Sequence, residues 1–242
     1  MAPPAETIWH EAECGGYAED LALWEELAAA HGSPVLELGA GAGRVALHLA
    51  RRGHDLDAVD IDAALVAAFN ERAAAEGLRA GARAGDVREL EPRRRYPLVI
   101  AAMQLYQLLG GPAGRLAVLR SISAALAPSG VAGLAIVEGE VQGEAGPDTL
   151  PDVREEGGWV YSSLPLAVRA TNGKLVVRRL RQRVSPAGEL TEAEHEDVLD
   201  LLDARAVEAE ARAVGLEPAG VRRIDESALH VGSAVVLLRR EA

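Results

Sequence analysis

Cysteine, basic residues and long apolar runs are all scarce in this chain of 242 residues. The single cysteine, Cys14, excludes an intramolecular disulfide and fits a reducing compartment. No apolar run is long enough to cross a bilayer, and the first residues lack the basic and apolar regions of a signal peptide. The formal net charge of −12 argues against a nucleic-acid partner, which normally needs a basic face. We therefore expect a cytoplasmic protein without a membrane or nucleic-acid partner, and the oligomeric state stays open.

The most informative segment is an apolar strand from Val35 that runs into a turn where glycine alternates with alanine. Gly39, Gly41 and Gly43 lack the Cβ atoms that would prevent a sharp turn and a close approach of the backbone to a ligand. A helix follows directly, and the N–H groups of its first turn would face that ligand. This pattern is typical of a nucleotide-binding loop.

The spacing of the glycines separates two classes of cofactor. A dinucleotide fingerprint reads G-x-G-x-x-G, but its third glycine position is occupied here by Arg44. The loop instead reads G-x-G-x-G, with Glu37 two residues ahead of the first glycine. In these residues the sequence resembles motif I of the class I S-adenosylmethionine-dependent methyltransferases, of the small-molecule type. An NAD(P)-dependent oxidoreductase remains the alternative, and a non-catalytic S-adenosylmethionine-binding regulator is a third possibility.

Two further strands end in an acidic residue, as the resemblance requires. Asp60 follows the strand that begins at Leu56, and a carboxylate there can accept both ribose hydroxyls of an adenosine. Asp86 follows the strand that begins at Ala80, and the resemblance implies that it accepts from the adenine amino group. The whole set of cofactor-binding residues implied for S-adenosyl-L-methionine is Tyr17, Glu37, Gly39, Ala40, Gly41, Gly43, Asp60, Ile61, Asp86, Val87 and Met103. Within this set, Val87 would donate its N–H to adenine, Met103 would line the methionine part, and Tyr17 would close the pocket.

Strands and helices alternate strictly along most of the chain, which predicts an α/β fold with a doubly wound, mostly parallel sheet. The resemblance implies seven strands in a Rossmann-like arrangement, the last running antiparallel between its two neighbours. A turn at Pro128–Gly130 precedes the fifth strand, and Tyr17, Leu21, Trp24 and Leu27 form one apolar stripe on an N-terminal helix. The predicted strands begin near 35, 56 and 80 and cover 97–102, 130–137, 216–224 and 231–239; the predicted helices cover 43–52, 63–76, 113–126 and 204–214.

The domain organisation is predicted from a change of period after the fifth strand. Residues 1–33 form a helical cap, 34–138 and 204–242 form the cofactor-binding core, and 139–203 form an inserted antiparallel lid that faces the substrate. Within the lid, Asn172-Gly173 is a strong hairpin signal and a second turn lies at 185–188, which predicts a three-stranded meander.

Charge pairing predicts the register of that meander. If Val184 pairs with Glu189, Arg181 lies opposite Glu192 and Arg179 lies opposite Glu194, and such pairs stabilise a ladder. The other face would then carry Val176, Leu180, Ala193 and His195, and would cover the ligand edge of the core sheet.

Methyl transfer from a sulfonium is a direct displacement, so positioning and exclusion of water supply most of the acceleration. The acceptor is predicted to be a small molecule with an N, O or C nucleophile, and no metal site is predicted. The catalytic residue stays unknown, with three weak candidates for a base: His195, Tyr106 and Glu138. Glu140 shares the position of Glu138 after the fifth strand, whereas His230 opens the last strand at the wrong end of the sheet.

Overall fold

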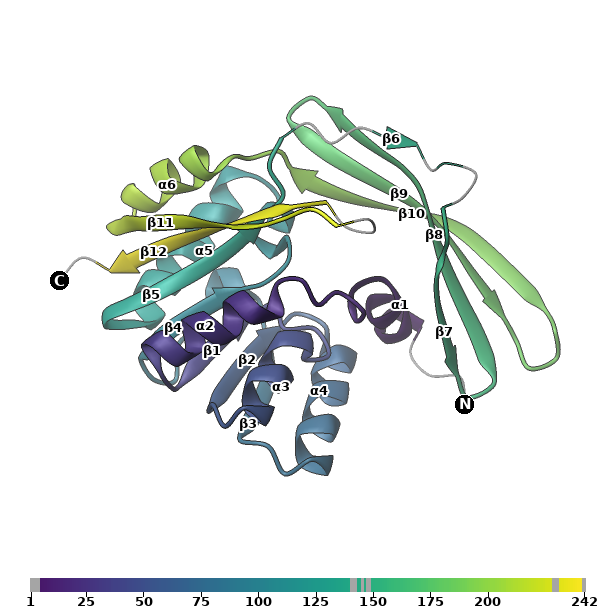
Figure 1. Ribbon diagram of the computed structural model, residues 1–242, viewed down its shortest axis with the longest axis horizontal. Helices are drawn as coiled ribbons and strands as arrows, with labels where there is room; N and C mark the ends of the chain where they lie inside the picture. Colours follow the sequence, from purple (N-terminus) through teal and green to yellow (C-terminus); the bar gives the residue numbers. More distant parts are fainter. Residues whose placement is uncertain (1–4, 140–142, 145, 147–148, 228–230, 241–242) are drawn as a thin grey trace. The chain divides into compact units, whose positions relative to one another are not determined.

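The computed structural model describes residues 5–139, 143–144, 146, 149–227 and 231–240 (Figure 1). The chain divides into two compact units. The insertion unit consists of Met1–Tyr17 and Glu140–Leu201, and the core unit consists of Ala18–Gly139 and Leu202–Ala242. The segment predicted as one helical cap, residues 1–33, is thus divided between the two units.

The core unit is built on a seven-stranded sheet with the order β11-β12-β5-β4-β1-β2-β3. All neighbours are parallel except β12, which runs antiparallel to both β5 and β11, as the resemblance implied. The strands are β1 (Val35–Leu38), β2 (Leu56–Asp60), β3 (Ala80–Ala84), β4 (Tyr96–Ala101), β5 (Leu126–Ile136), β11 (Leu216–Ile224) and β12 (Ser233–Arg240).

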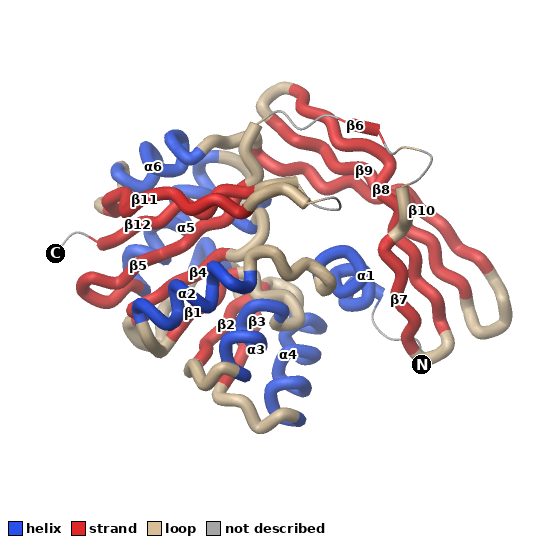
Figure 2. Tube along the Cα trace, viewed as in Figure 1, coloured by secondary structure: helices blue, strands red, loops and turns tan. Residues whose placement is uncertain are grey.

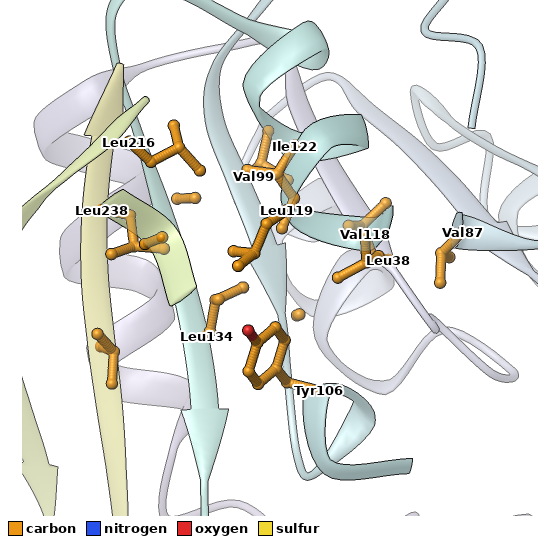
Figure 3. Packing of buried hydrophobic residues seen from close by; sticks show 14 of the residues in the cluster. Leu38, Val87, Val99, Tyr106, Val118, Leu119, Ile122, Leu134, Leu216 and Leu238 are labelled. Carbon is orange, nitrogen blue, oxygen red and sulfur yellow. The ribbon is translucent and has the colours of Figure 1, made fainter. Parts of the chain in front are cut away.

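Helices cover both faces of this sheet, which confirms the doubly wound fold (Figure 2). On one face, Leu119 and Ile122 of α5 pack with Leu134, Leu216 and Leu238 of the strands (Figure 3). The other face is covered by α2, α3 and α4. The helices of the core are α2 (Leu21–His31), α3 (Arg44–Arg51), α4 (Ala63–Ala75), α5 (Pro112–Ala125) and α6 (Ala204–Arg212), with short 3₁₀ helices η1 (Val87–Glu89) and η2 (Leu105–Leu108).

Side-chain caps explain where two of these helices begin. Asp62 precedes α4 and accepts hydrogen bonds from the N–H groups of Ala64 and Leu65. Asp203 precedes α6 and accepts from the N–H of Ala206. Both acids satisfy donors that the first turn of a helix leaves without a partner.

Two predicted boundaries in this region were wrong. Strand β5 begins at Leu126 rather than Gly130, so the predicted turn is an irregularity within the strand, where Ser129 has a φ of 62°. Pairing with β4 passes from Leu126 directly to Val131, and a Cβ on Gly130 would lie 2.8 Å from the carbonyl oxygen of Tyr96. Tyr17 does not begin a helix either, because α1 (Ala5–Cys14) ends before Gly15-Gly16 and α2 starts only at Leu21.

The insertion unit contains a second, antiparallel sheet with the order β10-β9-β8-β6, in which β7 also pairs with β8. The predicted meander corresponds to β8, β9 and β10, and the hairpin at Asn172-Gly173 is confirmed by the pairing of Thr171 with Lys174. Strands β6 and β7 were not predicted. The bounds are β6 (Gly143–Glu144), β7 (Asp152–Glu156), β8 (Trp159–Thr171), β9 (Lys174–Val184) and β10 (Leu190–Asp200).

The predicted register of β9 and β10 was wrong by one residue. Val184 pairs with Leu190, because the N–H of Ser185 donates to the Glu189 carbonyl and leaves Glu189 inside the turn. Arg181 therefore lies opposite Ala193, and Arg179 lies opposite His195.

The arginines of β9 are paired, but with other carboxylates than predicted. Arg179 binds Asp152 of β7 at 2.6 Å, and Arg178, which alternates to the opposite face, pairs with Glu194. Consequently Ala193 and His195 share a face with Arg179 and Arg181, whereas Val176 and Leu180 lie on the other face. The predicted mixed face of Val176, Leu180, Ala193 and His195 does not exist.

Helix α1 packs on this sheet through an aromatic contact and a buried carboxylate. Trp9 meets Tyr161 edge to face, with ring centroids 5.1 Å apart. Glu13 accepts from Nε and Nη2 of Arg181, both at 2.7 Å, and from the Ser163 hydroxyl at 2.7 Å. These donors outweigh the burial that opposes ionisation, so the pKa of Glu13 is lowered from its usual value.

We expect Glu13→Gln to destabilise the insertion unit by about 3 kcal/mol, because it removes the buried carboxylate that two nitrogens of Arg181 bind. A lowered pKa in the folded state means that the contribution of Glu13 is present above about pH 4.5 and is lost as the pH falls through the folded-state pKa. Denaturant unfolding at several pH values, followed by the fluorescence of Trp9 and Trp159, should therefore show a smaller acid-induced loss in the variant. The control is Glu144→Gln, whose partner Arg169 is 61% exposed; equal losses in the two variants would refute the prediction.

Candidate functional site

The glycine loop lies between β1 and α3 and has a left-handed backbone at each glycine. Gly39, Gly41 and Gly43 have φ angles of 65°, 54° and 95°. A Cβ on Gly43 would lie 2.7 Å from side-chain atoms of Leu47 and Phe69. Backbone conformation and packing therefore both require glycine at this last position.

Strand β2 holds this loop in place. The N–H groups of Gly39 and Ala40 donate to the Val59 carbonyl at 2.8 and 3.3 Å. The N–H of Gly41 donates to Oδ2 of Asp60 at 2.7 Å, while Oδ1 of Asp60 accepts from the N–H of Asp62 at 2.9 Å. Each oxygen of Asp60 thus accepts one backbone N–H and retains a lone pair for a further donor. The next residue, Ile61, is 71% exposed beside this carboxylate, although it is a large aliphatic residue.

Glu37, at the carboxyl end of β1, is buried beneath the loop. Its Oε2 accepts from the N–H of Ala46 in the first turn of α3 at 2.8 Å. Burial raises the pKa of Glu37 to about 8, against the lowering effect of the nearby Arg44 guanidinium. The N–H of Ala46 is therefore not available to a ligand, contrary to the expectation for this helix start.

Asp86 and Val87 start the short helix η1. The Asp86 carboxylate accepts from the N–H of Arg88 at 2.8 Å and from its guanidinium at 2.6 Å. These bonds lower the pKa of Asp86 and keep it ionised. Val87 is buried against the core.

The loop after β4 contributes two residues next to the glycine loop. Leu105 lies so close to Gly39 that a Cβ there would be 2.8 Å from its side chain. Met103, two residues earlier, is half-buried and has a φ of 52°, which is rare for a residue with a side chain. The carboxyl ends of β1 and β2 thus bring together Glu37, the glycines and Asp60, and the loop after β4 reaches Gly39 through Leu105. Tyr17 belongs to the insertion unit.

Two of the three candidate bases have structural roles in the core unit. Tyr106 is 1% exposed, and its hydroxyl donates to Glu210 at 2.6 Å, so burial raises its pKa far above the usual value. Glu138 accepts from the N–H of Ala204 at 2.6 Å through one oxygen and pairs with Arg223 through the other. These contacts tie both side chains to other residues of the core unit.

His195 is the remaining candidate and lies on β10 of the insertion unit. Its Nε2 is 3.3 Å from Oδ1 of Asp197, and the side chain is 37% exposed. Glu140 and His230 lie outside the described residues.

A buried ion pair behind the glycine loop escaped the sequence analysis. Asp20, which is 1% exposed, binds the guanidinium of Arg44 through two hydrogen bonds of 2.6 and 2.7 Å. The only available signal was Arg44 itself, which occupies the third glycine position of the dinucleotide fingerprint, because nothing local indicates a partner 24 residues away.

Comparison with known proteins agrees with this geometry. Residues 35–130 match the family model described as a methyltransferase domain, whereas no curated protein matches the chain. Among solved structures, the sugar N-methyltransferase KedS8 from Streptoalloteichus sp. is 16% identical with a TM-score of 0.75, over 100% of this chain and 95% of that one. The S-adenosylmethionine-bound amino pentose methyltransferase CalS10 from Micromonospora echinaspora is 18% identical with a TM-score of 0.71, over 100% and 98%. The CcbJ methyltransferase from Streptomyces caelestis is 21% identical with a TM-score of 0.68, over 94% and 92%.

At identities this low, the likeness to solved structures establishes only the fold. The family model adds that residues 35–130 match a methyltransferase domain, which agrees with the resemblance carried by the glycine loop and the acidic strand ends. The comparisons give no support to an oxidoreductase. Among the helices of the described residues, none is long and apolar enough to span a membrane.

Proposed function

We propose that this protein transfers the methyl group of S-adenosyl-L-methionine to the amine of a small molecule, specifically an amino sugar or an amine-bearing glycoside. The observation that carries the cofactor part is the glycine loop bound to Asp60 beside the buried Glu37. A dinucleotide needs free N–H groups for its pyrophosphate. Here carboxylates accept from the N–H groups of Gly41 and Ala46, which suits a cofactor without phosphate.

The remaining lone pairs of Asp60 would accept the ribose hydroxyls, and Ile61 would cover the adenine. Asp86 and Val87 would bind the adenine edge, and Met103 would line the methionine part. The small residues Gly39, Ala40, Gly41 and Gly43 would let the cofactor lie against the backbone, with Glu37 beneath it. When bound, the cofactor supplies an electrophilic methyl group, and the protein supplies position and shelter from water.

We choose an amine as the acceptor because amines and hydroxyls differ in whether they need a base to attack. A hydroxyl usually requires a base within hydrogen-bond reach, whereas an amine in its neutral form attacks directly. The Tyr106 hydroxyl donates to Glu210, and Glu138 pairs with Arg223, which favours an acceptor that needs no strong base. The similar proteins KedS8 and CalS10 are described as acting on a sugar nitrogen and on an amino pentose, which supports the same class of acceptor.

The proposal is tested by measuring S-adenosylhomocysteine release with a panel of acceptors. The panel contains amino sugars, each matched with the sugar that bears a hydroxyl in place of the amine, together with phenols and carboxylates. We expect turnover with an amino sugar and none with its matched hydroxyl compound. Turnover with phenols or carboxylates alone would contradict the choice of acceptor.

We expect His195→Ala to keep the rate per folded molecule within about threefold, since an amine acceptor needs little general-base catalysis. The control is Asp197→Asn, which removes the carboxylate beside His195 but keeps the ring. A fall in rate of roughly 100-fold in His195→Ala, with cofactor affinity intact, would instead identify His195 as the base.

A further inference from the structure

Asp20 occupies the N-cap of α2, but its side chain does not cap that helix. An aspartate at this position usually accepts from N–H groups of the first turn, and no such bond is present here. Its carboxylate instead accepts from Nε1 of Trp24 at 2.9 Å and from both terminal nitrogens of Arg44 at 2.6 and 2.7 Å. The side chains of Arg44 and Asp20 are 11% and 2% exposed, so this is a buried, two-pronged ion pair.

Arg44 is the first residue of α3 and follows Gly43 directly, at the end of the glycine loop. The ion pair therefore ties the end of that loop to the segment that enters α2. Three charged groups face the buried carboxyl of Glu37: Arg44 lowers its pKa, while Asp20 and Asp60, at the end of β2, raise it. The pair is thus also part of the electrostatic environment under the loop.

We propose that Asp20 and Arg44 are positioning residues for the methyl donor: their ion pair holds the end of the glycine loop in the conformation that accepts S-adenosylmethionine. This inference rests on the proposed function. If one partner is removed, the buried two-pronged bond is lost, and the start of α3 shifts as the remaining side chain adjusts. The loop then loses its alignment with the acids at the strand ends, although no residue in the predicted cofactor set has changed.

The test compares the full chain with Asp20→Asn and Arg44→Met. Dissociation constants for S-adenosylmethionine and S-adenosylhomocysteine are measured by calorimetry, together with the melting temperature without ligand and kcat at saturating cofactor. We expect both variants to melt earlier and to bind the cofactor roughly 10- to 100-fold more weakly. Their kcat at saturating cofactor should stay within about threefold, since the reacting atoms are not touched.

Two further variants separate positioning from general stability. Arg44→Lys keeps a cation but loses the two-pronged geometry, so it should restore part of the affinity lost in Arg44→Met. Glu26→Gln removes an exposed ion pair between α2, the helix that Asp20 precedes, and Arg222 of β11. The side chains of Glu26 and Arg222 are 58% and 41% exposed, so this variant should change neither the melting temperature nor the cofactor affinity. Because Arg44→Lys is the mildest change, it also keeps the test decisive if Asp20→Asn does not fold.

The pH dependence of binding gives a second readout. Burial raises the pKa of Glu37 to about 8, and a cationic ligand favours its ionised form, so affinity should rise as the pH passes through that value. Arg44→Met should move the pH midpoint of this rise in affinity upward, because Arg44 lowers the pKa of Glu37. Asp20→Asn should move the midpoint downward, because Asp20 raises that pKa. Wild-type affinity in the folded variants, or an unchanged midpoint in both, would overturn the inference. A wild-type protein that binds neither ligand would instead refute the proposed function.

Discussion

A shortened protein that lacks the insertion unit should bind S-adenosylhomocysteine normally and methylate nothing. This protein begins at Gly16 and replaces residues 140–201 by a short glycine-containing loop. The replacement is feasible, because Glu138 accepts from the N–H of Ala204 at 2.6 Å and so holds the two ends of the insertion together. We expect cofactor affinity within about threefold of the full chain, since the glycine loop, Asp60 and Glu37 all belong to the core unit. Turnover should fall by roughly 10³-fold or more if residues 139–203 form the substrate-facing lid that the sequence predicts.

The shortened protein carries its own control for folding. Trp24 is the one tryptophan it retains, and this residue is fully buried in the core unit. Its fluorescence therefore reports whether the core has folded before binding and turnover are measured. Normal turnover in a folded core would refute the sequence prediction that residues 139–203 form a substrate-facing lid, and would move the selection of the acceptor to the core itself.

Asp60→Ala should produce the largest loss of cofactor affinity among single substitutions outside the glycines. The carboxylate is 8% exposed, and the change removes the proposed acceptor of two ribose hydroxyls together with the partner of the Gly41 N–H. We expect a cost of about 2 to 3 kcal/mol, which is a rise of roughly 30- to 150-fold in the dissociation constant. Calorimetric titration with S-adenosylhomocysteine measures this rise.

The matched control is Asp203→Ala, which removes an aspartate that caps α6. It should cost about 1 kcal/mol of stability and leave cofactor affinity unchanged. A dissociation constant for Asp60→Ala that equals the wild-type value would remove Asp60 from the cofactor site.

Local sequence signals predicted those elements of both units that nearby residues specify. The glycines between β1 and α3 and the Asn172-Gly173 hairpin depend on the backbone preferences of single residues. The acidic ends of β2 and β3 follow from the alternation of strands and helices. These features needed no knowledge of distant contacts.

The features that the sequence did not predict depend on residues far apart in the chain. The hydroxyl of Tyr106 binds Glu210 across 104 positions, and Glu138 pairs with Arg223 across 85, so neighbouring residues could not indicate these contacts. The predicted register of β9 and β10 was wrong for the same reason, because Arg181 is paired with Glu13 of α1 and not with a carboxylate of the neighbouring strand. Charge pairing within one hairpin was therefore the wrong basis for the register.

The central claim is that the glycine loop, Asp60 and Glu37 form a site for S-adenosylmethionine. It is tested most directly by titrating the full chain with S-adenosylmethionine, S-adenosylhomocysteine and NAD in a calorimeter at constant pH. We predict saturable binding of the first two ligands and no response to NAD. Saturable binding of NAD, with no response to either sulfur compound, would contradict the account.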